Sequence, residues 1–307
     1  MTNRKSQMTN RESQSEWADV RVDSLSEATV AVVGLGLMGG SLAGALHGRC
    51  KMIIGIARRK ETALKAMELG LIDRATADLT AGVREADIAV LATPVRTILQ
   101  QIPQIGPLLS PGCLLTDLGS TKADIVEAMA GLPPHVQPLG GHPMCGKESS
   151  GIEAADVTLY RGRTYILSPL ERTSEKALSL GQALACAVGA NPLVVDAARQ
   201  DFLVATLSHL PYMLACALVA TADATTSADP LAWQIVASGF RDTSRVAGSD
   251  VTMMLDILLT NQGEVVNAMT QCLTQMKRLA QLVAEGDEAK LRQILGKIRN
   301  TRQEMFP

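Results

Sequence analysis

Apolar residues recur along this chain with two different spacings. As far as residue 196, short apolar runs with strand character occur at residues 29–33, 52–56, 87–92, 113–116, 136–139, 165–167 and 192–195. Helix-like segments lie between them, among them residues 60–69, 95–105 and 174–188. Strands that alternate with helices form a parallel sheet covered by helices on both faces. The pattern therefore predicts an α/β fold with a doubly wound parallel sheet over residues 28–196.

After residue 196 the apolar residues recur at the spacing of a helix, and no strand signal of comparable quality returns. The residues that share a face are Phe202, Thr206, His209, Met213 and Ala217 on one side, and Val265, Met269, Leu273 and Met276 on another. This spacing predicts an all-helical C-terminal domain over residues 197–307. Faces rich in methionine and leucine are typical of a core or a dimer interface.

The first 27 residues are polar and mixed in charge, with acidic side chains at Glu12, Glu16 and Asp19. They lack the apolar core of a secretory signal, and their acidity does not suit a transit peptide. We expect residues 1–27 to be a mobile N-terminal tail. No apolar run reaches the length that spans a bilayer, so we expect no membrane partner.

The composition narrows the classes of partner. Of the 307 residues, 47% are hydrophobic and 20% are charged, and the formal net charge is −2, so the chain has no electrostatic footprint for nucleic acid. The six cysteines are scattered with no CxxC pair, which argues against both a zinc site and a disulfide framework. We expect reduced thiols, a cytoplasmic location and no bound metal.

The first apolar run leads into the glycine-rich turn GLGLMG at residues 34–39 and then into a helix-like segment. In this arrangement the first glycine permits a tight turn, the second lets a pyrophosphate approach the backbone, and the third lets helix and strand pack closely. The N-terminus of the helix favours the negative charge of the ligand. The pattern predicts a Rossmann-type dinucleotide site. Its candidate residues are Gly34, Gly36, Leu37, Met38 and Gly39, together with Thr93 where the run at residues 87–92 ends.

The end of the second apolar run indicates which dinucleotide binds. An acidic residue there would bond the ribose 2′-hydroxyl of NAD, but this chain has Ala57 followed by Arg58 and Arg59. Two arginines suit a 2′-phosphate. We therefore favour NADP as cofactor. NAD is the alternative, in which the two arginines are only the solvated entry of a helix.

Two of the four histidines lie where chemistry is expected. His142 follows two glycines near a strand end, and His209 lies in an otherwise apolar helix, where an unpaired imidazole would be costly. Taken alone, each is a satisfied core histidine as often as a catalytic one. Farther along, Arg241 and Arg245 stand at positions i and i+4, so one of them could hold a substrate carboxylate through two hydrogen bonds.

Six segments carry most of these candidates. They are GLGLMGGSLA from residue 34, ATP at 92–94, DLGSTK at 117–122, GGHPMCGKESSG at 140–151, SHLP at 208–211 and GFRDTSRVAGSD at 239–250. Together they resemble the prephenate and arogenate dehydrogenases of tyrosine biosynthesis, collinearly from about residue 28 to residue 261. The resemblance implies a Rossmann domain followed by a helical dimerisation domain, a homodimer, and a cleft between the domains where cofactor and substrate meet.

The resemblance also implies roles for particular residues. His142 matches the base that accepts the proton of the ring hydroxyl, and Ser120 matches a serine that hydrogen-bonds the same region. His209 and Arg241 match substrate-binding positions, with Arg241 on a carboxylate, and Glu148 matches an acidic residue at the mouth of the site. The implied reaction is an oxidative decarboxylation in which the ring becomes aromatic. Aromatisation drives it, so the protein mainly orients the substrate and places one base, and no metal is required.

Other hypotheses remain at this point. The substrate is arogenate or prephenate. The runner-up enzyme is a β-hydroxyacid dehydrogenase, but that family uses a catalytic lysine in its helical domain, and this chain has no lysine between Lys176 and Lys277. A third hypothesis is an NADP-binding protein without turnover, and the set of histidines, serine and arginine just described argues against it.

Overall fold

The computed structural model describes residues 18–147, 149–226, 228–229 and 231–306. Contacts divide the chain into two compact units. The sheet unit comprises Met1–Val204 with Gly248–Asn261, and the helical unit comprises Ala205–Ala247 with Gln262–Pro307. Helices α8 (Ala197–Val204) and α11 (Val251–Thr260) thus group with the sheet unit, whereas the sequence pattern placed all of residues 197–307 in one domain.

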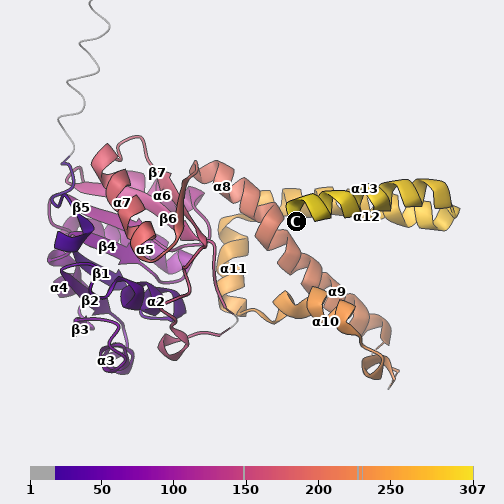
Figure 1. Cartoon of the computed structure of the whole chain (residues 1–307), viewed down its shortest axis with the longest axis horizontal. Helices are drawn as coiled ribbons and strands as arrows, with labels where there is room; N and C mark the ends of the chain where they lie inside the picture. The colour runs from indigo at the N-terminus through magenta and orange to yellow at the C-terminus, as the bar shows by residue number, and fades with distance from the viewer. Residues whose placement is uncertain (1–17, 148, 227, 230, 307) are drawn as a thin grey trace, which may run out of the picture. The chain divides into compact units, whose positions relative to one another are not determined.

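An eight-stranded sheet forms the centre of the sheet unit, with strand order β3-β2-β1-β4-β5-β6-β7-β8 (Figure 1). The strands are β1 (Thr29–Val33), β2 (Met52–Ile56), β3 (Arg74–Thr76), β4 (Ile88–Leu91), β5 (Cys113–Asp117), β6 (Val136–Pro143), β7 (Thr164–Pro169) and β8 (Asn191–Val194). Neighbouring strands are parallel except β6 and β7, which are antiparallel. The predicted α/β, Rossmann-type fold is confirmed, with one antiparallel pair that the pattern did not indicate.

Strands β3 and β6 depart most from the apolar runs of the sequence. The short strand β3 was missed because its three residues are all half-buried and form no apolar run. Strand β6 continues past residue 139, and glycines at 140 and 141 allow this because neighbouring backbone lies close. A Cβ atom on Gly141 would lie 2.4 Å from the carbonyl oxygen of Asp117. His142 therefore lies inside strand β6, whereas the apolar run predicted that the strand ends at residue 139.

Alternate residues of the central strands face two separate apolar layers. Val30 and Val32 of β1 belong to the layer closed by α2, α3 and α7, and Ala31 and Val33 belong to the layer closed by α4, α5 and α6. The helices and short turns of this unit are η2 (Leu25–Glu27), α2 (Leu37–Leu46), α3 (Lys60–Glu68), α4 (Leu79–Arg84), α5 (Val95–Ile105), η3 (Gly106–Leu108), α6 (Ala123–Ala130), η4 (Ile152–Ala154) and α7 (Glu175–Ala187). All five residues of β1 are buried, as expected for a strand covered on both faces.

The segment before β1 packs on the sheet unit. Ala18 donates its N–H to Pro134, Arg21 donates its N–H to Gly112, and the Arg21 guanidinium forms an ion pair with Asp87. Val20 and Leu25 are each 8% exposed. The expectation that the whole of residues 1–27 is a free tail is therefore wrong for residues 18–27, which short apolar and charged contacts hold in place. Residues 1–17 lie outside the described residues.

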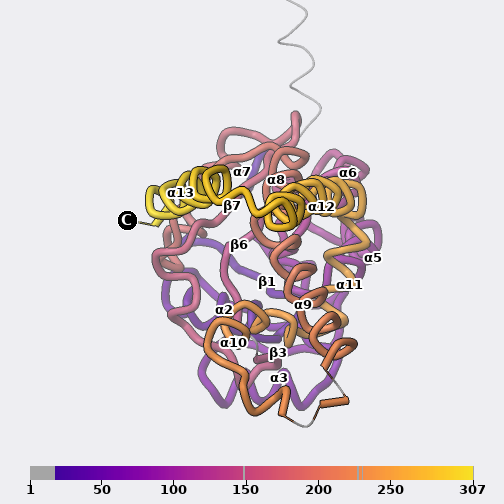
Figure 2. The backbone as a smooth tube through the Cα atoms, turned by 90° about the vertical axis from the view of Figure 1, so that its right-hand side faces the viewer, coloured from indigo at the N-terminus to yellow at the C-terminus, as the bar shows by residue number. Residues whose placement is uncertain are grey.

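The helical unit contains η5 (Ala205–His209), α9 (Leu210–Thr226), η6 (Ala232–Gln234), α10 (Ser238–Ser244), α12 (Gln262–Glu285) and α13 (Glu288–Met305), with η7 (Arg245–Gly248) at its border. Helices α12 and α13 lie side by side (Figure 2). Apolar side chains are poorly covered here. Leu273 and Met276 on α12 are each 57% exposed, and α13 contains no buried residue.

The elements α8, η5 and α9 follow one another as a continuous helix, Ala197–Thr226. By length and composition alone, this is the one helix among the described residues that could cross a membrane. The expectation that no apolar run reaches this length is therefore wrong, because one stretch of 18 residues within this helix has a mean hydropathy of 1.8. One such helix is weak evidence for a membrane span, since core helices meet the same criteria.

Candidate active site

Predicted site residues from four strands meet at one edge of the sheet. β1 leads into Gly34, β4 into Thr93 and β5 into the loop of Ser120, and His142 lies near the end of β6. These strands are parallel neighbours in the order β1, β4, β5, β6, so their carboxyl ends lie along the same edge. Open α/β sheets bind their ligands at this edge.

The glycine turn has the geometry of a nucleotide cradle. Gly34 has a φ of +102°, and a Cβ atom there would lie 2.9 Å from the Cγ2 atom of Thr93. A Cβ on Gly39 would lie 1.9 Å from the carbonyl oxygen of Gly34, so this glycine lets helix α2 approach the turn. At Gly36 a Cβ would meet no described atom within 4 Å, which leaves space for a ligand at the point where α2 begins. Leu37 and Met38 lie in the first turn of α2, where backbone N–H groups have no partner within the helix and can bind an anion.

Basic side chains follow the neighbouring strand β2. Ala57 is buried, whereas Arg58 and Arg59 are exposed, and neither arginine pairs with a carboxylate among the described residues. Arg59 is the residue before α3 begins. Two unpaired guanidinium groups next to the β1 turn can accept a phosphate.

Asp117 ties the Ser120 loop to the strand that carries His142. Its carboxylate accepts the N–H of Gly119 at 2.7 Å and the N–H of Gly141 at 2.9 Å, and it forms a fully buried ion pair with Lys122. Burial raises the pKa of Asp117 and lowers the pKa of Lys122, while the opposite charge of each partner acts against both shifts. Removing either partner would leave an uncompensated buried charge.

The Ser120 loop has further partners from helix α8 that no sequence pattern indicated. The carbonyl oxygen of Ser120 accepts a hydrogen bond of 3.3 Å from Nε2 of Gln200. The carboxylate of Asp201 accepts the N–H groups of Lys122 and Ala123 at 2.7 and 2.8 Å. These contacts join residues 78 to 80 positions apart, so no local pattern could have indicated them.

His142 is 8% exposed and pairs in register with Ile166 of β7. Farther along the same segment, burial raises the pKa of the Cys145 thiol to about 11, so this sulfur stays protonated at neutral pH. Lys147 forms an ion pair of 2.7 Å with Asp156. Glu148, predicted at the mouth of the site, lies outside the described residues.

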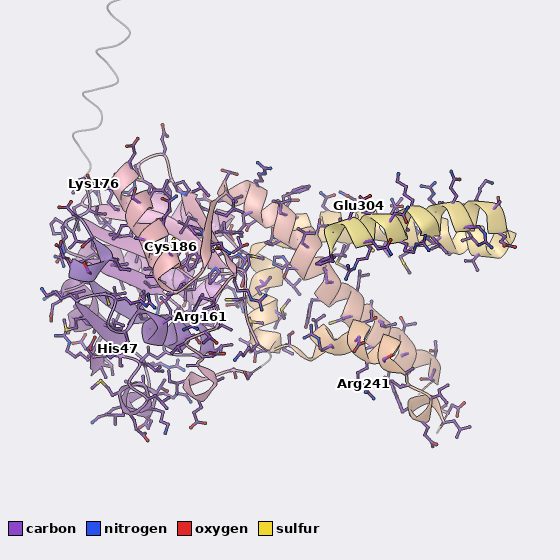
Figure 3. All side chains as sticks on the ribbon, in the orientation of Figure 1. His47, Arg161, Lys176, Cys186, Arg241 and Glu304 are labelled. Carbon is purple, nitrogen blue, oxygen red and sulfur yellow. The ribbon has the colours of Figure 1, made fainter. Side chains whose placement is uncertain are left out.

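His209 and Arg241 belong to the helical unit and are described within it. His209 ends the π-helical turn η5, and π-helical turns occur often at functional sites. It is 2% exposed, and burial lowers its pKa to about 4, so it is neutral at neutral pH. Arg241 is exposed on α10 (Figure 3), and its guanidinium forms no ion pair with a described carboxylate. A free guanidinium can bind a carboxylate, whereas a neutral imidazole can only donate or accept a hydrogen bond.

The sheet order, the glycine turn and the open space at Gly36 define a Rossmann-type nucleotide-binding protein. Two family models match the chain, the nucleotide-binding domain of prephenate dehydrogenase over residues 42–193 and the dimerisation domain of prephenate dehydrogenase over residues 196–297. The chain belongs to the prephenate dehydrogenase family. These matches do not favour the β-hydroxyacid dehydrogenase alternative.

Individual relatives agree with this assignment. The chain is 33% identical to a prephenate dehydrogenase of Bacillus subtilis over 267 residues, which are 86% of this chain and 72% of the relative. It resembles the crystal structure of Synechocystis arogenate dehydrogenase with a TM-score of 0.80 and 32% identity, covering 90% of this chain and 99% of that one. It resembles the Aquifex aeolicus prephenate dehydrogenase in complex with hydroxyphenyl propionate and NAD+ with a TM-score of 0.84 and 31% identity, covering 92% and 99%.

Proposed function

We propose that this protein catalyses the oxidative decarboxylation of arogenate to tyrosine, of prephenate to 4-hydroxyphenylpyruvate, or of both, with a nicotinamide dinucleotide. The observation that carries the proposal is the common edge of the sheet, where a glycine turn with space for a ligand lies in line with Ser120 and His142. The solved structure of the Aquifex relative, described with NAD+ and hydroxyphenyl propionate, supports both ligand classes.

In this reaction His142 acts as the base. It takes the proton from the ring hydroxyl of the substrate, and Ser120 hydrogen-bonds the same oxygen and orients it. A bound nicotinamide supplies the acceptor for the hydride that leaves the same carbon. The resulting ketone draws electrons across the ring, carbon dioxide leaves, and the ring becomes aromatic. The glycine turn and the first turn of α2, including Leu37 and Met38, hold the pyrophosphate.

Residues of the helical unit and of the loop after β6 bind the substrate in this proposal. Arg241 holds a carboxylate, His209 contributes a hydrogen bond as a neutral imidazole, and Glu148 stands at the mouth of the site. The low pKa of His209 supports this division, because a neutral ring leaves the positive charge for the carboxylate to Arg241.

We favour NADP over NAD. The support is the pair of exposed, unpaired arginines Arg58 and Arg59 directly after β2, at the position where NAD-binding sheets carry an acidic residue. A ribose 2′-phosphate would gain charge-assisted hydrogen bonds from these side chains.

We also propose that the protein is a homodimer through its helical unit. The family model that matches residues 196–297 is a dimerisation domain. Apolar side chains of α9, α12 and α13 are exposed, and exposed apolar surface of this kind marks a site of protein association. A second copy would cover Leu214, Leu273 and Met276, among others. The same contact accounts for the apolar helix Ala197–Thr226 without a membrane.

Initial rates test the proposed reaction. Purified protein is mixed with arogenate or prephenate, each with NADP or NAD, and the absorbance of the reduced nicotinamide is followed. Turnover of either substrate supports the reaction, and the better pair identifies substrate and cofactor. Folded protein that binds NADP but is silent in all four mixtures would reject the proposal and favour a binding protein without turnover.

A further inference from the structure

We propose that Gln200 and Asp201, neighbours on helix α8, are positioning residues that hold Ser120 for the reaction. This inference rests on the proposed function, because it concerns how a residue of the same site is placed. Both side chains act through the Ser120 loop.

The carboxylate of Asp201 holds the end of the loop. Its Oδ1 atom accepts the N–H of Lys122 at 2.7 Å, and its Oδ2 atom accepts the N–H of Ala123 at 2.8 Å, where helix α6 begins. The side chain is 3% exposed, so both bonds form away from water. A carboxylate at a helix N-terminus is favoured by charge and satisfies N–H groups that lack partners within the helix.

Gln200 holds the beginning of the loop. Its Nε2 atom donates to the carbonyl oxygen of Ser120 at 3.3 Å and to Oδ1 of Asp201 at 2.9 Å, and the residue is fully buried. Its Oε1 atom is buried without a hydrogen-bond partner among the described residues. An unpaired buried oxygen costs stability, so an apolar side chain of similar size would pack here at lower cost. Contact with Ser120 explains why an amide occupies the position.

A second helix completes these contacts. Thr260, at the end of α11, shares a hydrogen bond of 2.8 Å with the hydroxyl of Thr121. Asn261 donates from Nδ2 to the carbonyl oxygen of Asp201 at 2.8 Å, which joins α11 to α8. Every residue from Ser120 to Ala123 is thus bound by a residue that lies far along the chain. Together these contacts form what we call the α8 clamp.

The clamp matters because proximity catalysis depends on placement to a fraction of an ångström. A loosened Ser120 would still lie near the substrate but would orient the hydroxyl less well. We therefore expect loss of the α8 clamp to lower kcat while cofactor binding, which uses the glycine turn, stays unchanged.

Gln200→Met tests the clamp, because methionine keeps the length of the side chain and removes the amide. We expect kcat to fall about tenfold with an unchanged cofactor KM. The matched control is Gln137→Met, which changes another buried glutamine of the sheet unit, bonded to Ala18 and Ser174 at the opposite end of β6. This control should lower Tm and leave kcat unchanged.

A double-mutant cycle with Ser120→Ala identifies the route of the effect. If Gln200 acts through Ser120, Gln200→Met should cost little more once the serine hydroxyl is absent. The same tenfold loss in the Ser120→Ala background would overturn the proposal, as would an unchanged kcat in the single variant or an equal loss in Gln137→Met.

Amide hydrogen exchange gives a readout that does not need turnover. Gln200→Met and the milder Asp201→Asn should both speed exchange in a peptide that spans residues 120–123, and Gln137→Met should not. If wild-type protein fails with both substrates, the proposed reaction is rejected while this measurement still decides the clamp. Unchanged exchange in both α8 variants would overturn it.

Discussion

The two units of this chain differ in how they bury apolar surface. The sheet unit closes two apolar layers around its own strands, and β1, β4 and β5 are buried along their whole length. In the helical unit α10 and α13 contain no buried residue, and α12 buries only Val265, Ala268 and Leu282. The sheet unit completes its core within one chain, whereas the helical unit leaves many of its apolar side chains exposed.

In the proposed function the chemical step takes place in the sheet unit, and His142→Asn is the variant expected to have the largest effect on it. We expect kcat to fall by about a hundredfold or more, with cofactor affinity nearly intact, since asparagine cannot act as a base. Steady-state rates and cofactor titration measure the two quantities. His47→Asn is the control, because His47 is an exposed histidine at the end of α2 (Figure 3). A near-normal rate in His142→Asn would remove His142 from the role of base.

If the exposed apolar side chains of the helical unit form the dimer interface, a charge placed among them should weaken the dimer. Leu273→Asp should raise the dissociation constant of the dimer about 30-fold, because a charge would enter a surface that buries apolar side chains. Light scattering over a range of protein concentrations measures it. Leu64→Asp is the matched control, since Leu64 is 56% exposed on α3 of the sheet unit. A wild-type monomer, or equal effects of the two variants, would contradict a dimer through the helical unit.

Substrate binding should depend on the helical unit. Arg241→Gln should raise the KM for substrate about tenfold, because a charge-assisted hydrogen bond to the carboxylate is lost, and change kcat less. Arg292→Gln, on the exposed face of α13, serves as control. An unchanged KM would show that another cation, with Arg245 the first candidate, holds the carboxylate.

Cofactor choice should depend on the sheet unit alone. Arg58→Ala and Arg59→Ala should each raise the KM for NADP about fivefold and leave the KM for NAD unchanged, since only NADP carries the 2′-phosphate. Initial rates with each cofactor measure this selectivity. Equal changes for the two cofactors would mean that the arginines do not bind the 2′-phosphate.

The pH dependence of stability in the helical unit should reflect the buried imidazole of His209. Burial lowers the pKa of His209 from 6.5 to about 4, so between these values the unfolded chain binds more protons than the folded one. The contribution of neutral His209 is therefore complete above about pH 6.5 and is lost as the pH falls toward 4. Thermal unfolding across this range should show a shallower pH dependence in His209→Gln than in wild type, and equal slopes would contradict burial of a neutral imidazole.

Much of the sheet could be predicted because its strands are apolar along their length. The runs at residues 29–33 and 52–56 coincide with β1 and β2, and the helix expected at residues 95–105 coincides with α5. Strand β3 escaped prediction because an edge strand needs little apolar surface. The antiparallel direction of β7 is set by pairing across the sheet, which a local pattern does not encode.

The candidate site also has one part that the sequence predicts and one part that it does not. The glycine turn follows a local rule, in which positive φ and close approach demand glycine at fixed spacing, so its positions could be predicted from the sequence. The α8 clamp follows no such rule. Gln200 and Asp201 lie in an ordinary stretch of helix, and only the folded chain brings them to residues 120–123.

The antiparallel pairing of β6 and β7 bears on the order in which contacts of α2 can form during synthesis. Because β7 starts at the edge where β6 ends, the connection between them stays beside α2. There Tyr160 donates its hydroxyl to the carbonyl of Met38, and Ser41 accepts the N–H of Asp156. Helix α2 thus gains these two hydrogen bonds from residues made more than a hundred positions after it. During translation α2 lacks both of these hydrogen bonds until residues 156–160 have left the ribosome.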